Sequence, residues 1–83
     1  MNRYYLFIKE SSFGGYHYDL FDEYRGTLIS GDYVSRDKDI NRDPFLYKME
    51  IDISLFYILK KDKPRFNDIN WFITKYGLEE KII

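Results

Sequence analysis

The stretch FLYKMEIDISLFYIL, residues 45–59, decides the fold because apolar and polar residues alternate through most of it. Every odd position is apolar, and positions 48, 50, 52 and 54 carry Lys, Glu, Asp and Ser. A period of two is typical of a strand with one buried face. A single strand over the whole stretch would extend roughly 50 Å, longer than strands in globular proteins usually run. We therefore expect a strand from Phe45 with a bend or bulge near Asp52 to Ser54.

The second half of this stretch leaves two interpretations open. Phe56 and Ile58 make the even positions apolar as well, so the alternation is lost there. The segment Ser54 to Lys61 either continues the strand or forms a short helix that begins at Ser54.

A helix is predicted from Asn67 to Tyr76, close to the C-terminal end. Asn67 has a side chain that caps helices, and Phe66 before it is placed to pack on Trp71 as a hydrophobic staple. One face of the helix is apolar at spacings of three and four residues: Ile69, Phe72, Ile73 and Tyr76. Gly77 should end the helix in a Schellman motif that brings Leu78 onto Ile73.

The N-terminal half reads as a series of strands joined by turns. Arg3 to Lys9 (RYYLFIK) is apolar on both faces, which indicates a central strand. A pair of glycines follows and favours a hairpin into a second strand over Tyr16 to Tyr24, and Thr27 to Ser30 is a third short strand. Ser35 to Pro44 has no apolar pattern and is expected to be a loop. The whole chain, 1–83, is thus predicted to be one α+β domain with a small antiparallel sheet of about four strands packed against one C-terminal helix.

Composition limits the classes of function. The chain has no Cys, which excludes disulfides and thiolate metal sites and favours a cytoplasmic location. Thirteen Lys and Arg stand against fourteen Asp and Glu, so no global field attracts nucleic acid. The apolar run Tyr4 to Ile8 is too short to cross a bilayer, and we expect no membrane partner. Frequent Ile, Lys, Asn, Tyr and Phe without Ala hint at an AT-rich gene of a low-GC bacterium or phage.

Oxygen ligands at alternate positions form one candidate metal site, which consists of Asp37, Asp39, Asn41 and Asp43. The spacing resembles that of EF-hand calcium loops over seven residues. It departs from that pattern because Arg42 stands where the loop needs Gly and Lys48 stands where it needs Glu. A solvated loop of alternating charge is the competing interpretation. We expect no cofactor, with calcium at this loop as the alternative.

A basic cluster before the predicted helix is a second candidate site, and it consists of Lys60, Lys61, Lys63 and Arg65. Helix N-termini favour anions, so these cations could complete a contact with phosphate or nucleic acid, and Trp71 could stack on a base. A solvated turn between two buried elements explains the same residues.

The single His and the acidic pairs are expected to be structural or solvated. His17 has no second His or Cys with which to build a zinc site, and no motif supplies it with a Ser and an Asp for a nucleophilic triad. Asp19 with Asp22, and Glu79 with Glu80, are interpreted as solvated surface carboxylates.

The aromatic surplus is the remaining signal, with nine Tyr, seven Phe and one Trp. Some of this surface must stay exposed, and exposed aromatics anchor protein contacts. The candidate partner face consists of Tyr5, Tyr16, Tyr18, Tyr24 and Tyr33. We therefore expect a non-enzymatic module that binds a protein partner or itself, and a phage-encoded binder that modulates or inhibits a host or defence protein is the concrete form of this expectation. Binding of single-stranded nucleic acid is the alternative, and a small metal-dependent nuclease is the second alternative.

Overall fold

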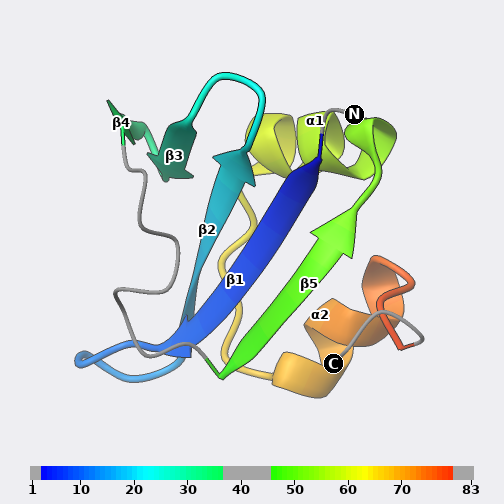
Figure 1. Cartoon of the computed structure of the whole chain (residues 1–83). Coiled ribbons are helices and arrows are strands. Elements are labelled where there is room, and N and C mark those ends of the chain that lie inside the picture. Colours follow the sequence, from blue (N-terminus) through cyan, green and yellow to red (C-terminus); the bar gives the residue numbers. More distant parts are fainter. Residues whose placement is uncertain (1–2, 37–45, 80–83) are drawn as a thin grey trace.

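A computed structural model describes residues 3–36 and 46–79, which form a five-stranded antiparallel sheet and two helices (Figure 1). The strands are β1 (Tyr4–Glu10), β2 (Tyr16–Asp22), β3 (Thr27–Ser30), β4 (Tyr33–Arg36) and β5 (Tyr47–Ile51). The helices are α1 (Ile53–Asp62) and α2 (Ile69–Lys75). The α+β prediction is confirmed, and β4 and α1 add to the predicted elements.

The strands lie in the order β4-β3-β2-β1-β5, so β1 is flanked on both sides as its sequence predicts. β1 to β4 follow one another as a meander, and β5 returns to pair with β1. The β4 strand corrects the expected loop, which was placed from Ser35 onward: Ser35 pairs with Leu28 on β3. The central part of that loop lies outside the described residues.

The transition from β5 to α1 resolves the two interpretations of the alternating stretch in favour of the helix. Asp52 ends the strand, because its Oδ1 accepts a hydrogen bond from the Leu55 amide at 2.8 Å and caps α1. Phe56 and Leu59 after it are three residues apart, so in a helix both side chains point toward the sheet and are buried. The helix ends at Lys63, whose left-handed backbone (φ 48°) lets its amide donate to the Leu59 carbonyl at 3.1 Å.

α2 begins one residue later than predicted. The cap is Asp68 and not Asn67: its Oδ1 accepts from the amides of Asn70 at 2.9 Å and Trp71 at 3.3 Å. The predicted staple between Phe66 and Trp71 is also wrong, because Phe66 stacks on Phe72 with ring centroids 4.0 Å apart. With the cap at Asp68, the fourth residue of the helix is Phe72 and no longer Trp71, and Phe72 is the residue that Phe66 contacts.

The end of α2 agrees with the prediction. The Leu78 amide donates to the Ile73 carbonyl at 2.9 Å and the Gly77 amide to the Thr74 carbonyl at 3.3 Å, which is a Schellman motif. Gly77 has the positive φ (64°) that this motif requires. Leu78 is fully buried as a result.

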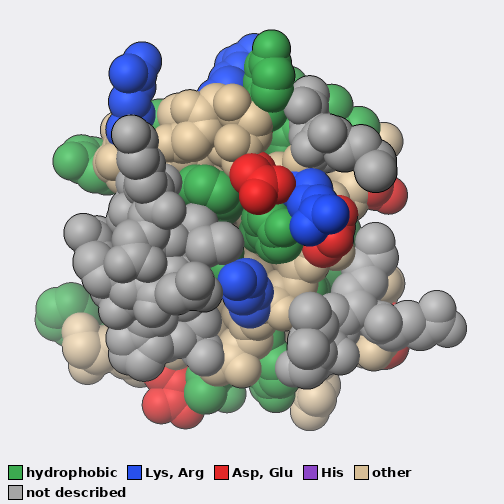
Figure 2. All heavy atoms as spheres, in the orientation of Figure 1, with side chains coloured by type: hydrophobic (Ala, Val, Ile, Leu, Met, Phe, Trp, Pro, Cys, Tyr) green, Lys and Arg blue, Asp and Glu red, His purple; other side chains and the backbone are tan. Residues whose placement is uncertain are grey.

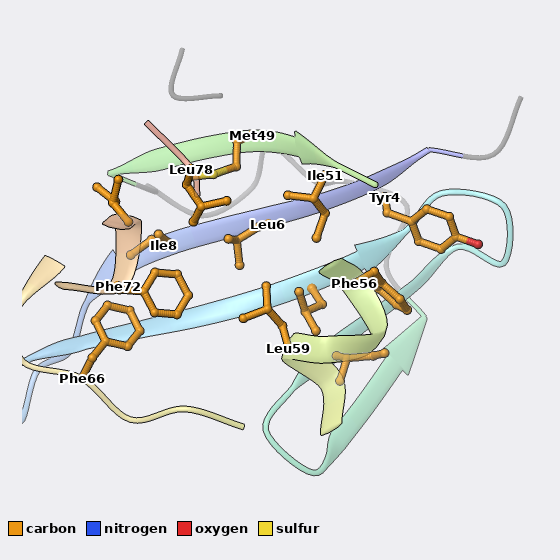
Figure 3. Close-up of a cluster of buried hydrophobic side chains, with 13 residues drawn as sticks. Tyr4, Leu6, Ile8, Met49, Ile51, Phe56, Leu59, Phe66, Phe72 and Leu78 are labelled. Atoms are coloured by element: carbon orange, nitrogen blue, oxygen red, sulfur yellow. The ribbon is translucent and has the colours of Figure 1, made fainter. Parts of the chain in front are cut away.

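Both helices cover the same face of the sheet, and the core lies between them and the strands (Figure 3). The side chains that meet there come from six elements and the segments beside α2, and the largest fully buried ones include Leu6, Ile8, Leu20, Met49, Leu59, Phe72 and Leu78. On the other face, Phe7 is also fully buried, with Tyr5 beside it at 6.3 Å and the Lys48 ammonium 5.9 Å from its ring. The sheet is therefore apolar on both sides at β1. Neither helix of the described residues is long and apolar enough to cross a membrane.

Candidate functional site

The solvent side of α1 is unusually apolar for an exposed helix face. Phe56 and Leu59 point into the core, yet Ile53, Tyr57 and Ile58 remain 50%, 50% and 47% exposed. Ile53 and Tyr57 are one helical turn apart and Tyr57 adjoins Ile58, so the three share one surface with the small Ser54 among them. We call Ile53, Ser54, Tyr57 and Ile58 the outer face of α1.

The helix that carries this face is firmly held. Phe56 packs on Tyr4 with ring centroids 4.7 Å apart, and the Tyr18 hydroxyl donates to the Leu59 carbonyl at 3.2 Å. Together with the Asp52 cap, these contacts fix α1 to β1 and β2. The outer face of α1 is therefore a rigid platform, which loses little conformational freedom if it is covered by a partner.

Charge is distributed unevenly along α1. Asp52 stands exposed at the N-terminal end, while Lys60 and Lys61 occupy the last turn together with Asp62, and the two lysines also favour the helix dipole. The Lys60 ammonium lies 5.8 Å from the Tyr57 ring centroid. The apolar outer face of α1 is thus bordered by one acidic and one basic end.

The predicted basic cluster is divided by the structure. Lys60 and Lys61 belong to α1, whereas Lys63 forms an ion pair with Asp32 in the turn between β3 and β4. This pair holds the pKa of Asp32 below its ordinary value, through the hydrogen bond from Lys63 first and its charge second. Arg65 is exposed in the connection to α2.

The predicted anion site also required free backbone amides at the N-terminus of α2, and the structure does not provide them for Asn70 and Trp71. The Asp68 carboxylate already accepts from two of those amides and places a negative charge there. Trp71 is 43% exposed on this helix, and the Lys75 ammonium lies 4.9 Å from its ring. In the view of Figure 2, described side chains of both charge signs lie next to one another.

The five predicted partner tyrosines do not share one face. The register of β1 and β2 places Tyr5 on the side of the sheet away from the helices, and Tyr16 and Tyr18 on the covered side. Tyr16 and Tyr18 stack on Phe66 at 5.9 Å and 6.4 Å. Tyr24 and Tyr33 are 72% and 71% exposed, in the β2 to β3 turn and at the start of β4.

His17 has partners that no sequence motif indicates. Its Nε2 lies 2.8 Å from Asp19 Oδ1 and 2.7 Å from Ser30 Oγ, because β2 and β3 bring these residues together. Both contacts use the same ring nitrogen, Nε2. A nucleophilic triad needs the acid on Nδ1 and the serine as donor to Nε2. The arrangement therefore fixes the histidine and does not activate Ser30.

The interpretation of Asp19 and Asp22 as solvated is wrong. They are 3% and 7% exposed, and each is held by a specific contact. Asp19 accepts from His17, and Asp22 accepts from the Arg25 amide at 3.2 Å and lies 3.8 Å from the Arg25 guanidinium. Their burial follows from strand pairing, which the local sequence does not reveal. Of the second pair, Glu79 is exposed and Glu80 lies outside the described residues.

The hairpin between β1 and β2 carries the most exposed aromatic side chain of the described residues. Phe13 is 98% exposed at its tip, and the turn is closed by a hydrogen bond from the Ser11 amide to the Gly15 carbonyl at 3.0 Å. A shallow pocket of about 260 Å³ lies beside the hairpin, and its lining consists of Glu10, Ser11, Gly14, Gly15, Tyr16 and Asn67. The pocket is open and mostly polar, so it offers little apolar surface to a small ligand.

The candidate calcium ligands Asp37, Asp39, Asn41 and Asp43 lie outside the described residues. Within residues 3–36 and 46–79, no three His, Asp or Glu side chains are grouped so that they could hold a metal ion.

Sequence reasoning missed the outer face of α1 because Ile53, Tyr57 and Ile58 were assigned to a strand that alternates or to an undecided segment. A helical projection of residues 53–62 would have placed apolar residues all around the helix, which is the one available signal. Comparison with known proteins adds no relative: the chain matches no protein-family model, and no curated protein or solved structure is significantly similar to it.

Proposed function

We propose that this chain is a non-enzymatic protein-interaction module that binds its partner through the outer face of α1. The observation that carries the proposal is the exposure of Ile53, Tyr57 and Ile58 together on a rigid helix. Covering a half-exposed side chain of this size contributes roughly 1 kcal/mol, so the three together contribute on the order of 3 kcal/mol. Exposed apolar side chains that lie together mark binding surfaces more often than isolated ones do.

The charges at the ends of α1 support a protein as the partner. Lys60 and Lys61 border the apolar residues at one end and Asp52 at the other, so the surface has an apolar centre and a polar rim. Protein interfaces have the same arrangement, in which a buried aromatic side chain is surrounded by polar residues. Tyr57 is the aromatic anchor of this surface.

Site-specific photocrosslinking tests the proposal. A photoreactive phenylalanine derivative replaces Tyr57, and in a second variant it replaces Thr74, an exposed residue of α2 that serves as the control. In cells that encode the chain, position 57 should form defined protein adducts and position 74 should not. Adding Ile58→Asp should remove the adducts of position 57 without lowering the melting temperature. The absence of adducts at position 57 would overturn the proposal.

Nucleic-acid binding is the second candidate, and the exposure of Lys60, Lys61 and Arg65 favours it. Fluorescence anisotropy with a labelled single strand at low salt tests it directly, because phosphate contacts weaken steeply as salt rises. Affinity that is lost in a Lys60→Ser and Lys61→Ser variant would support this function. Absence of binding at low salt removes it.

A further inference from the structure

The two ends of α1 carry opposite charges, and the middle carries one large and one small residue side by side. Asp52 lies at the first end, Lys60 and Lys61 lie at the second and outnumber Asp62 there, and Tyr57 and Ser54 lie between the two ends. On this surface the acidic end complements the basic end, and the small Ser54 complements the large Tyr57. Such a surface suits a two-fold interface, in which the same patch of each copy contacts that of the other. From this pattern we infer that the occupant of the outer face of α1 is α1 of a second copy, in antiparallel orientation. The inference rests on the proposed function and names its partner.

Antiparallel pairing matches the shapes of the side chains. With the two-fold axis between Leu55 and Phe56, Tyr57 of each copy faces Ser54 of the other, so the large side chain enters the space that the small one leaves. Ile53 and Ile58 then border this contact on either side and exclude water from it. The two copies supply six half-exposed apolar side chains to one interface.

Charge selects the antiparallel orientation over the parallel one. In antiparallel pairing the end with Lys60 and Lys61 lies beside Asp52 of the other copy. The Asp52 carboxylate is exposed, and its Oδ1 accepts from the Leu55 amide. Parallel pairing would place Lys60 and Lys61 of both copies together, which like-charge repulsion opposes. The same ion pairs should make the dimer weaker in high salt.

The size of the surface sets the expected affinity. A helix of ten residues is about 15 Å long, so a pair of such helices covers less area than a standard protein interface. We expect a dissociation constant of roughly 10 µM to 1 mM, which is the range of small, reversible contacts. The chain should therefore be a monomer when dilute and a dimer when concentrated.

Sedimentation equilibrium of the whole chain from about 20 µM to 1 mM tests the inference. The mean mass should rise from 10.2 kDa toward twice that value as concentration increases. Ile58→Asp should raise the dissociation constant at least tenfold, and Ser54→Arg should do the same by filling the space that Tyr57 needs. Thr74→Asp on α2 is the matched control and should leave the dissociation constant unchanged. Circular dichroism of each variant checks that it is folded.

The outcomes separate this inference from the proposed function. A monomer at 1 mM overturns self-association, and Tyr57 adducts with other proteins would then still support docking by α1. A dimer that Ile58→Asp and Ser54→Arg leave unchanged uses another surface and also overturns the inference. Adducts of position 57 with the mass of two chains, together with weakening by both variants, support it.

Discussion

The Tyr18 hydroxyl donates a hydrogen bond to the Leu59 carbonyl at 3.2 Å and so joins the middle of the sheet to the last turn of α1. The Tyr18 ring lies 5.8 Å from Phe72, on the covered side of the sheet. Burial raises the pKa of Tyr18 to about 12, with smaller contributions from neighbouring Tyr76 and Asp62. Burial also raises the pKa of Tyr76, and the negative charge of Asp62 is the second cause of this shift.

The protein should lose stability in alkaline solution because of these phenols. The pKa of Tyr18 is raised on folding, so its full contribution is present below pH 10, the ordinary value, and is lost as the pH rises toward 12. The unfolded chain binds fewer protons than the folded one in this window. The free energy of unfolding should therefore fall, by on the order of 1 kcal/mol between pH 8 and pH 11 for Tyr18 alone. Urea unfolding at pH 8, 10 and 11 measures it.

Tyr18→Phe is the control for that prediction. The variant should be less stable at pH 8 by about 1 kcal/mol, because the Leu59 carbonyl loses one of its two donors and keeps only the Lys63 amide. Between pH 10 and 11 its stability should fall less than that of the unchanged protein. An equal fall in both proteins would show that Tyr18 does not cause the alkaline sensitivity.

Replacing Gly15 by Ala should destabilise the protein more than replacing Gly14 by Ala. Both glycines have positive φ, but a Cβ on Gly15 would lie 2.4 Å from Asn67 Oδ1 and 3.3 Å from the Phe66 carbonyl, whereas one on Gly14 meets nothing within 4 Å. We expect about 1 kcal/mol for Gly14→Ala from backbone strain and above 2 kcal/mol for Gly15→Ala. Thermal unfolding measures both. Combining each variant with Asn67→Gly should reduce the difference in stability between Gly15→Ala and Gly14→Ala. If the two single variants lose the same stability, the close contact between position 15 and Asn67 is contradicted.

The cap of α2 can be identified by two single substitutions. Asp68→Ala should cost about 1 kcal/mol, because the amides of Asn70 and Trp71 lose their acceptor. Asn67→Ala should cost much less, since no hydrogen bond of the described residues uses that side chain to cap α2. Chemical denaturation compares them. A larger cost for Asn67→Ala would restore the cap that the sequence suggested.

Lys63→Gly should stabilise the protein even though it removes an ion pair. Lys63 has a left-handed backbone (φ 48°), which costs a residue with a side chain about 1 kcal/mol more than Gly. The pair with Asp32 is exposed to solvent, where such pairs contribute little. Lys63→Ala keeps the strained backbone and loses the pair, so it should be slightly destabilising. If both variants lose the same stability, the ion pair outweighs the backbone effect.

Much of the fold could be predicted because its signals are local. The Gly77 stop, the apolar face of α2 and the two-sided apolar character of β1 are all set by neighbouring residues, and they are as predicted. The cap of α2 was placed one residue early because Asn67 and Asp68 both have capping side chains, and only the geometry selects between them. The local sequence does not decide between strand and helix at α1, because Asp52 fits both a polar strand position and the N-cap that it forms in the structure.

The candidate sites were harder to predict because they depend on which strands pair. Alternation along β2 places Tyr18 and Asp19 on opposite faces, but only the register with β1 decides which face α1 and α2 cover. The five predicted partner tyrosines share a residue type but not a face of the sheet, so the structure places them on different surfaces. His17, Asp19 and Ser30 meet although Ser30 is on another strand. Pairing of this kind follows from the whole sheet.

The pairing of β1 with β5 orders events during synthesis of the chain. Strands β1 to β4 can form their meander once residue 36 has left the ribosome, but β1 keeps one free edge until residue 51 follows. The apolar face that Leu6 and Leu20 contribute to gains its first cover when α1 follows, and the cover is completed only by Leu78, the last fully buried residue of the described part of the chain. A nascent chain therefore exposes part of the apolar face of its sheet until translation is nearly finished. A chain that pauses or is truncated before Leu78 should be bound by chaperones or degraded by proteases.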